Sequence, residues 1–341
     1  MSKKISITGI SGQVGATLTK ELLIRDPNCK IYGFKRRSSS HNTERLDHLF
    51  NDPLFKNRIE LAYGDLSDYG SILNFVGDVK PDYLYNCAAM SHVKVSEVVP
   101  DYCMDIVSTG PVRVLEAIRK TSPKTKFLQL SSSEQFGNSV ANPETNKQSE
   151  LTPFIPESIY ACAKVSAYHS TGYYRRAYNM FASNALAFNM EGPLRGPTFL
   201  TKKTVNAAVR ISLGLQDYLH LGNLNSKRDF NHINDSVDAF IKIMEADKPD
   251  DFVVATGISY SIKEFVEMVF SKLGLDWEKY VKHDPKYLRA SELNTLCGDA
   301  SKIKKELNWT PKHTIHDLID DMINADMKIA KQELLIKNHE K

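Results

Sequence analysis

The sequence of 341 residues has no long apolar run, little net charge and few cysteines, and each absence excludes a class of protein. No apolar stretch approaches the ~20 residues that a transmembrane helix needs, so we expect no membrane partner. The net charge of +3 is too small to indicate nucleic acid or an anionic membrane as a partner. A strand predicted almost at Met1 leaves no room for a signal peptide, and we therefore expect a cytoplasmic protein.

The cysteines are odd in number and scattered, without a Cys-x-x-Cys pair, which is typical of reduced thiols rather than of a disulfide framework. We expect these thiols to be buried, and we expect no metal site. The five cysteines are Cys29, Cys87, Cys103, Cys162 and Cys297.

Apolar residues make up 42% of the chain and charged residues 25%, which suits one large unit or two lobes around a full core. Strand patterns alternate with helix patterns, and this predicts an α/β fold: a doubly wound parallel sheet of the Rossmann type. We expect residues 1–188 to form this domain, with residues 229–257 returning to it. A smaller, interleaved C-terminal α/β lobe would then comprise residues 189–228 and 258–341.

A glycine-rich turn follows the first predicted strand, Lys4 to Thr8, and precedes a helix predicted to begin near Ala16. Its glycines are spaced Gly-x-x-Gly-x-x-Gly, at Gly9, Gly12 and Gly15. Glycines here permit a tight turn and close backbone approach to a pyrophosphate, and the helix N-terminus offers amide donors. The pattern predicts a dinucleotide site.

The second predicted strand, residues 30–34, ends in Lys35-Arg36-Arg37-Ser38-Ser39-Ser40. An NAD site normally has an acidic residue here to hold the ribose hydroxyls. Cations and hydroxyls suit the 2′-phosphate of NADP instead, so we expect NADP; the alternative is a solvated basic loop.

Tyr160 and Lys164 lie four residues apart, which places them on one face of a helix. The Lys164 ammonium is expected to lower the pKa of the Tyr160 phenol, so that Tyr160 accepts a proton from a substrate alcohol. The segment Ser131 to Glu134 ends another predicted strand and adds a carboxylate beside the same site. A simple alcohol dehydrogenase has no use for this carboxylate, so Glu134 indicates proton removal next to a carbonyl, hence elimination.

With these elements in view, the chain resembles the extended short-chain dehydrogenases/reductases and, within them, the GDP-mannose 4,6-dehydratases. The resemblance covers nearly the whole length. It is carried by residues 36–40 with Asn42-Thr43, and by the segments 63–66, 91–96, 192–196, 199–203, 222–224 with 227–229, 255–257, 298–302 and 307–311.

The resemblance implies a 4,6-dehydratase acting on a GDP-hexose, most simply GDP-mannose. Transient oxidation at carbon 4 would be followed by loss of water across carbons 5 and 6 and by return of the hydride to carbon 6. The catalytic residues would be Ser132, Glu134, Tyr160 and Lys164.

The same resemblance, with the motifs above, assigns the binding residues. The cofactor is expected to contact Gly9, Ser11, Gly12, Gln13, Val14, Gly15, Arg36, Arg37, Asp65, Leu66, Ala88, Ala89, Ser91, Tyr102, Tyr160, Lys164, Met190 and Arg195. The GDP-sugar is expected to contact Ser91, Ser132, Glu134, Asn189, Lys203, Asn223, Arg228, Arg289 and Glu292.

The chain departs from the usual pattern of these dehydratases near the sugar. Met90 and Met190 replace a Gln and a His, which removes hydrogen-bonding groups, and Ser132 stands for Thr. Further departures are Leu194 for Arg, Asn294 for Asp and Val14-Gly15-Ala16 for Asp-Gly-Ser. Alternatives therefore stay open: a GDP-manno-heptose 4,6-dehydratase, a GDP-sugar 4-dehydrogenase or epimerase, or a non-enzymatic NADP-sensing regulator.

A homo-oligomer, dimer or tetramer, is also implied. Helices near residues 102–120 and 160–178 would pair with their symmetry mates. The segment from Arg36 to Arg45 would reach a neighbouring subunit and join dimers into a tetramer.

Overall fold

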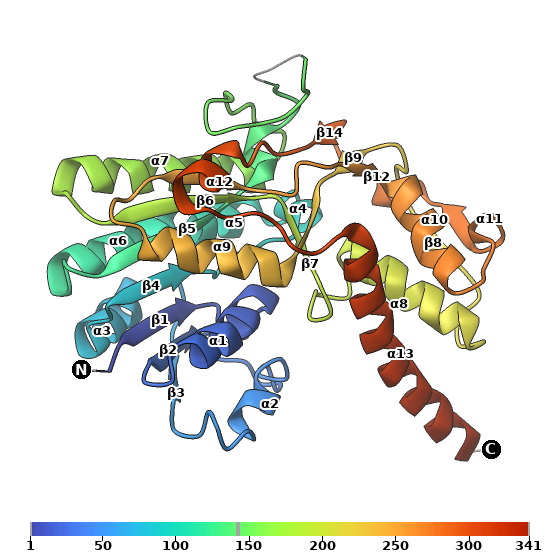
Figure 1. The fold of residues 1–341 in the computed structure, drawn as a ribbon, viewed down its shortest axis with the longest axis horizontal. Coiled ribbons are helices and arrows are strands. Elements are labelled where there is room, and N and C mark those ends of the chain that lie inside the picture. Colours follow the sequence, from blue (N-terminus) through green and yellow to red (C-terminus); the bar gives the residue numbers. More distant parts are fainter. Residues whose placement is uncertain (1, 141–143, 340–341) are drawn as a thin grey trace.

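The computed structural model describes residues 2–140 and 144–339, and its centre is a seven-stranded parallel sheet. The strand order is β11-β6-β5-β4-β1-β2-β3 (Figure 1). The order reverses between β1 and β4, and in open α/β sheets ligands bind outside the strand ends at such a point. The strands are β1 (Lys4–Thr8), β2 (Lys30–Lys35), β3 (Ile59–Tyr63), β4 (Tyr83–Asn86), β5 (Lys126–Ser132), β6 (Ala182–Ala187) and β11 (Asp251–Val254).

Helices cover both faces of this sheet, as its apolar strands require. One face carries α1 (Gln13–Arg25), α9 (Ile233–Glu245) and α12 (Ser301–Leu307). The other carries α3 (Tyr69–Val79), α5 (Pro100–Met104), a π-helical turn (Asp105–Thr109), α6 (Gly110–Thr121) and α7 (Ile159–Tyr178). Short elements at the strand ends are α2 (Asp47–Phe50), α4 (Val93–Ser96) and a 3₁₀ turn (Ser133–Phe136).

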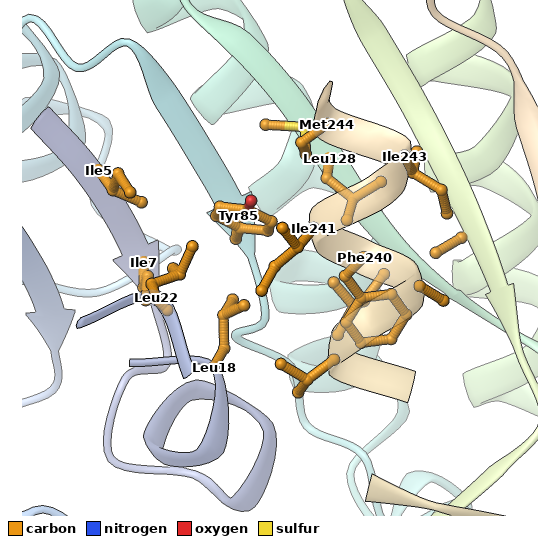
Figure 2. Close-up of a cluster of buried hydrophobic side chains, with 14 of the residues drawn as sticks. Ile5, Ile7, Leu18, Leu22, Tyr85, Leu128, Phe240, Ile241, Ile243 and Met244 are labelled. Atoms are coloured by element: carbon orange, nitrogen blue, oxygen red, sulfur yellow. The ribbon is translucent and has the colours of Figure 1, made fainter. Parts of the chain in front are cut away.

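The core beneath α1 and α9 shows how the sequence builds these layers. Alternate residues of the inner strands point to this face, among them Ile5, Ile7, Tyr85 and Leu128, and all are buried. They meet Leu18 and Leu22 of α1 and four residues of α9: Phe240, Ile241, Ile243 and Met244 (Figure 2). The intervening strand residues therefore point to the opposite face, toward α7.

A second lobe lies beside the sheet (Figure 1). Its core joins α8 (Leu200–Ser212), α10 (Ile262–Lys272) and α13 (Ile315–His339), with α11 (Trp277–Tyr280) against it. Short strands complete it: β8 (Leu219–Leu221) with β13 (Val281–His283), and β9 (Lys227–Arg228) between β12 (Tyr260–Ser261) and β14 (Thr295–Leu296). A 3₁₀ turn (Pro285–Tyr287) follows β13. Strand β7 (Asn189–Glu191) pairs with β10 (Phe230–His232).

The predicted fold class is confirmed, including the late strand that returns to pair with β6. The division into residues 1–188, 189–228, 229–257 and 258–341 remains a prediction. Helix α1 begins at Gln13, earlier than the Ala16 expected, because the helix starts directly at the glycine turn. The expectation of buried thiols was wrong for Cys162, which lies on the exposed side of α7. No helix within the described ranges is long and apolar enough to cross a membrane.

Candidate functional site

A cleft of about 1220 Å³ lies at the carboxyl ends of the central strands and continues between them and the second lobe. It is lined by every predicted catalytic, cofactor-binding and substrate-binding residue except Arg37. Residues far apart in the chain thus meet in one cavity.

The glycine turn lies at one end of the cleft and is shaped by close backbone contacts. Gly9 has φ +65°, and a Cβ there would lie 2.8 Å from the Cα of Ala88. A Cβ on Gly15 would lie 2.5 Å from the Gly9 carbonyl oxygen. Helix α1 follows Gly12 without a side-chain cap, so its N-terminus faces the cleft with the positive end of its dipole. These features fit the pyrophosphate of a dinucleotide.

The basic segment after β2 contributes one arginine to the cleft. Arg36 lines the cleft, and its Nη1 donates to the Tyr102 hydroxyl at 2.9 Å. Arg37 instead lies over the Tyr63 ring, 5.5 Å from its centroid, and outside the cleft lining. The contact of both arginines with the cofactor stays a prediction; Arg37 is exposed and turned toward β3.

Tyr160 and Lys164 lie on α7, as predicted, and both are buried. The Lys164 Nζ donates to the Leu130 carbonyl at the end of β5 and lies 5.7 Å from the Tyr160 ring centroid. Burial lowers the pKa of Lys164 to about 8. Burial also raises the pKa of Tyr160, although a hydrogen bond with Ser132 opposes this shift. The expected lowering of the Tyr160 pKa was therefore wrong for this structure, because loss of hydration outweighs the nearby charges.

Ser132 and Glu134 are held at the start of the 3₁₀ turn that follows β5. The Ser132 Oγ accepts from the Glu134 amide at 3.3 Å, and the Gln135 Oε1 accepts from the Ser132 amide at 2.9 Å. This capping box fixes the turn. The Glu134 carboxylate accepts from the Arg289 Nη1 at 3.1 and 3.2 Å, so the second lobe supplies its partner.

Charged residues from the second lobe line the opposite wall. Burial lowers the pKa of Arg228 to about 10, and its Nη1 donates to the carbonyls of Lys227 and Leu293. The Glu292 Oε1 accepts from the Arg289 amide at 2.9 Å and so orders the loop that carries this arginine. The wall thus presents guanidinium groups beside Glu134.

The other predicted substrate residues are spread along the same cleft. The Lys203 Nζ lies 3.5 Å from the Tyr287 ring centroid and donates to the His220 carbonyl. The Asn223 Nδ2 donates to the Ser226 Oγ at 3.0 Å. Asn189 begins β7 and lines the cleft, as does Ser91.

Several lining residues escaped the sequence analysis. Arg45 donates to the Leu194 carbonyl at 2.8 Å and so ties the basic segment to the loop before α8. Phe199 stacks on the Arg195 guanidinium, 3.8 Å from it, and Tyr287 packs against Lys203. Arg45 lies in the basic segment and Phe199 in the motif 199–203, but the contacts of Phe199 and Tyr287 with their cations arise only through tertiary folding. No cluster of three or more metal-ligating side chains occurs in residues 2–140 and 144–339.

Comparison with known sequences gives a family match across most of the chain. The family described as GDP-mannose 4,6 dehydratase matches residues 7–322. GDP-mannose 4,6 dehydratase 1 of Arabidopsis thaliana is 43% identical over 336 residues, which cover 97% of this chain and 91% of the relative. GDP-mannose 4,6-dehydratase of Yersinia enterocolitica is 40% identical over a match that covers 98% of this chain and 96% of the relative.

Solved structures share the architecture at lower identity. The dTDP-glucose 4,6-dehydratase of Bacillus anthracis, solved in complex with NAD, superposes with a TM-score of 0.83 at 21% identity, covering 97% of this chain and 98% of that one. RMD of Pseudomonas aeruginosa, complexed with NADPH, superposes with a TM-score of 0.76 at 19% identity, covering 96% of this chain and 100% of that one. These likenesses show the fold.

We predict that Gly9→Ala destabilises the protein more than Gly214→Ala. Both glycines have positive φ, but a Cβ on Gly214 meets nothing within 4 Å. Gly214→Ala should lower the free energy of unfolding by about 1–2 kcal/mol, and Gly9→Ala by roughly 1–3 kcal/mol more, because its Cβ overlaps the backbone of Ala88. Denaturant titrations followed by circular dichroism measure this. Equal losses would contradict the described contact.

Proposed function

This chain belongs to the GDP-mannose 4,6-dehydratase family, and on that premise we propose that it converts GDP-mannose to the GDP-4-keto-6-deoxy sugar. The observation that carries the proposal is the placement of Tyr160, Lys164 and Glu134 around one cleft beside the glycine turn. An alcohol oxidation needs the first two residues. An elimination next to the new carbonyl needs the third.

We propose NADP as the cofactor. Its pyrophosphate would lie against the glycine turn, and Arg36 would meet the 2′-phosphate. When bound, NADP would supply the hydride acceptor for carbon 4 of the sugar and the hydride donor for carbon 6, so no net oxidation would occur. Ala88, Ala89, Asp65 and Leu66 would line the rest of its path.

Tyr160 acts as the base in the first step and takes the proton of the carbon 4 hydroxyl. Its buried phenol has a raised pKa, so it needs positive charge nearby to become a phenolate. Lys164 supplies a fixed cation from the same face of α7, 5.7 Å from the Tyr160 ring centroid. Ser132 hydrogen-bonds the phenol and so holds it toward the sugar.

Glu134 acts in the second step, when the carbon 4 ketone has made the proton on carbon 5 acidic. The carboxylate removes this proton, and Ser132 and Glu134 assist departure of the carbon 6 hydroxyl as water. The ion pair with Arg289 must loosen for this, because the guanidinium donates to both carboxylate oxygens that could take the proton. The substrate diphosphate offers Arg289 an alternative partner, and Lys203 and Arg228 would join it there.

A second substrate, GDP-manno-heptose, is favoured by the two methionines of the pocket. Met90 and Met190 line the cleft, and each packs against one of the sheet's cores. Methionine is flexible enough to line a pocket for a seventh carbon. A 4-dehydrogenase, an epimerase or an NADP-sensing regulator would each give a different product pattern in the assay below.

We also propose a homo-oligomer. Large apolar side chains are exposed along α4, α5 and the residues between them: Val95, Val98, Val99, Tyr102 and Met104. Tyr173 and Tyr178 of α7 are also exposed. Such a face suits pairing with a symmetry mate, and the segment from Arg36 to Arg45 would extend the dimer to a tetramer. Light scattering at micromolar concentration measures the state; a fully active monomer would rule the proposal out.

The function is tested by incubating the purified protein with GDP-mannose, GDP-manno-heptose, GDP-N-acetylglucosamine and UDP-sugars, followed by mass spectrometry. We expect loss of one water from GDP-mannose. Water loss from the heptose alone would identify the second candidate, and oxidation or epimerisation without water loss would exclude a dehydratase. NADP binding without any turnover would favour the regulator.

Glu134→Gln should still allow oxidation at carbon 4 but should block the elimination of water, since the amide cannot take the carbon 5 proton. Tyr160→Phe is the matched variant, because it should block the earlier step while NADP remains bound. Exchange of solvent deuterium into carbon 5 separates the two steps. Normal exchange in Glu134→Gln would show that another group is the base.

Arg36→Met should weaken NADP by roughly 1.5–3 kcal/mol, about a tenfold to hundredfold rise in Kd, and should leave NAD nearly unchanged. Only NADP carries the phosphate that Arg36 would meet. Arg37→Met is the control, because this neighbouring arginine lies outside the cleft lining. Calorimetric titration of both cofactors measures the effect. An equal NADP loss in the two variants would contradict the assignment.

A further inference from the structure

Three polar side chains lie in register across the middle of the sheet, on the face toward α7. Thr8 of β1 is the Cα partner of Asn86 on β4, and Asn86 is the partner of Gln129 on β5. All three are at least 98% buried. Buried polar groups require hydrogen bonds, and these three bond to one another.

Their hydrogen bonds all run in one direction and form a chain. The Ala88 amide donates to the Thr8 Oγ1 at 3.2 Å, and the Thr8 Oγ1 donates to the Asn86 Oδ1 at 2.6 Å. The Asn86 Nδ2 then donates to the Gln129 Oε1 at 2.7 Å. This chain of hydrogen bonds begins at Ala88, which lines the cleft directly beside the glycine turn.

The chain ends on a carbonyl that it shares with Lys164. The Gln129 Nε2 donates to the Leu130 carbonyl oxygen at 3.0 Å, and the Lys164 Nζ donates to the same oxygen. A carbonyl oxygen has two lone pairs, so these two donors occupy its full capacity. The Gln129 side-chain amide therefore limits how strongly the Leu130 carbonyl can bind the Lys164 ammonium.

We propose that Gln129 is a positioning residue for Lys164, and that the chain from Thr8 through Asn86 keeps its amide on the Leu130 carbonyl. By taking one lone pair, Gln129 leaves the ammonium free to extend toward Tyr160. Without Gln129, the carbonyl would draw Lys164 toward β5 and away from the phenol. The structural part of this inference stands on the hydrogen bonds alone, whereas its catalytic consequence rests on the proposed function.

The surroundings of Lys164 make this shared carbonyl its dominant partner. No carboxylate forms an ion pair with Lys164 anywhere in the described ranges of the chain. The titratable groups that face it are Cys87, Cys103 and Tyr160. Burial raises the pKa of both thiols, that of Cys87 to about 12, so they are uncharged near neutral pH.

The direct test is the ionisation of Lys164 in the purified full chain, measured without any substrate. Lysine labelled with ¹³C at Cε reports this by NMR, and Lys164→Met assigns the signal. Wild-type Lys164 should titrate near pH 8, well below ordinary lysines. In Gln129→Met, a side chain of similar size that cannot donate, the pKa should rise by about one unit, because the whole carbonyl now binds the ammonium.

Thr171→Val is the matched control. Its hydroxyl donates to the Ala167 carbonyl on the same helix and is equally buried, but it lies away from Lys164. This variant should leave the titration of Lys164 unchanged. A rise in Gln129→Met with no change in Thr171→Val supports the proposal. An unchanged Lys164 titration in Gln129→Met overturns it.

Thr8→Val keeps the test decisive if Gln129→Met fails to fold. It removes the donor at the far end of the chain without changing side-chain shape. A smaller rise of the Lys164 pKa in this variant supports the proposal, because the effect must pass through Asn86 and Gln129. No rise overturns it.

Activity separates this inference from the proposed function. In the pH profile of kcat, the low-pH limb reports the loss of the proton from the base, Tyr160. In Gln129→Met this limb should move to higher pH, while the KM for the sugar stays nearly unchanged. A wild-type enzyme without turnover on any GDP-sugar would refute the proposed function, while the NMR titration would still decide the role of Gln129. Turnover with an unshifted limb would overturn the positioning role.

Discussion

The contact between the buried Lys164 ammonium and the Leu130 carbonyl joins the two elements on which the site depends. An ammonium removed from water is costly unless it is hydrogen-bonded, so this contact constrains how α7 sits on β5. Tyr160 lies one turn earlier on α7, and Ser132 lies two residues after Leu130 on β5. This contact therefore holds together the two elements that carry Tyr160 and Ser132, both of which line the cleft.

The second lobe completes the site by bringing charge to the other wall. Glu134 belongs to the turn after β5, and its partner Arg289 comes from the loop after β13, 155 residues later. This pair makes the surroundings of the Glu134 carboxylate depend on how the lobes meet. A substrate whose phosphates attract Arg289 would thereby alter the carboxylate that is to act on its own sugar.

Local patterns in the sequence predicted the parts of the site that local structure determines. The glycine turn and the spacing of Tyr160 and Lys164 follow from strand, turn and helix geometry, and the structure places them as predicted. The direction of the Tyr160 pKa shift could not be predicted in this way, because burial is a property of the assembled fold. The outward position of Arg37 and the pairing of Glu134 with Arg289 likewise depend on contacts between distant segments.

We propose that the hydride of carbon 4 returns to carbon 6 of the same sugar while Tyr160 and Glu134 move protons. GDP-mannose carrying deuterium at carbon 4 tests this proposal, with mass spectrometry and NMR of the product. We expect deuterium at carbon 6 of the same molecule and no accumulation of reduced cofactor in solution. Loss of the label to free NADPH, or its retention at carbon 4, would show that the hydride is not returned.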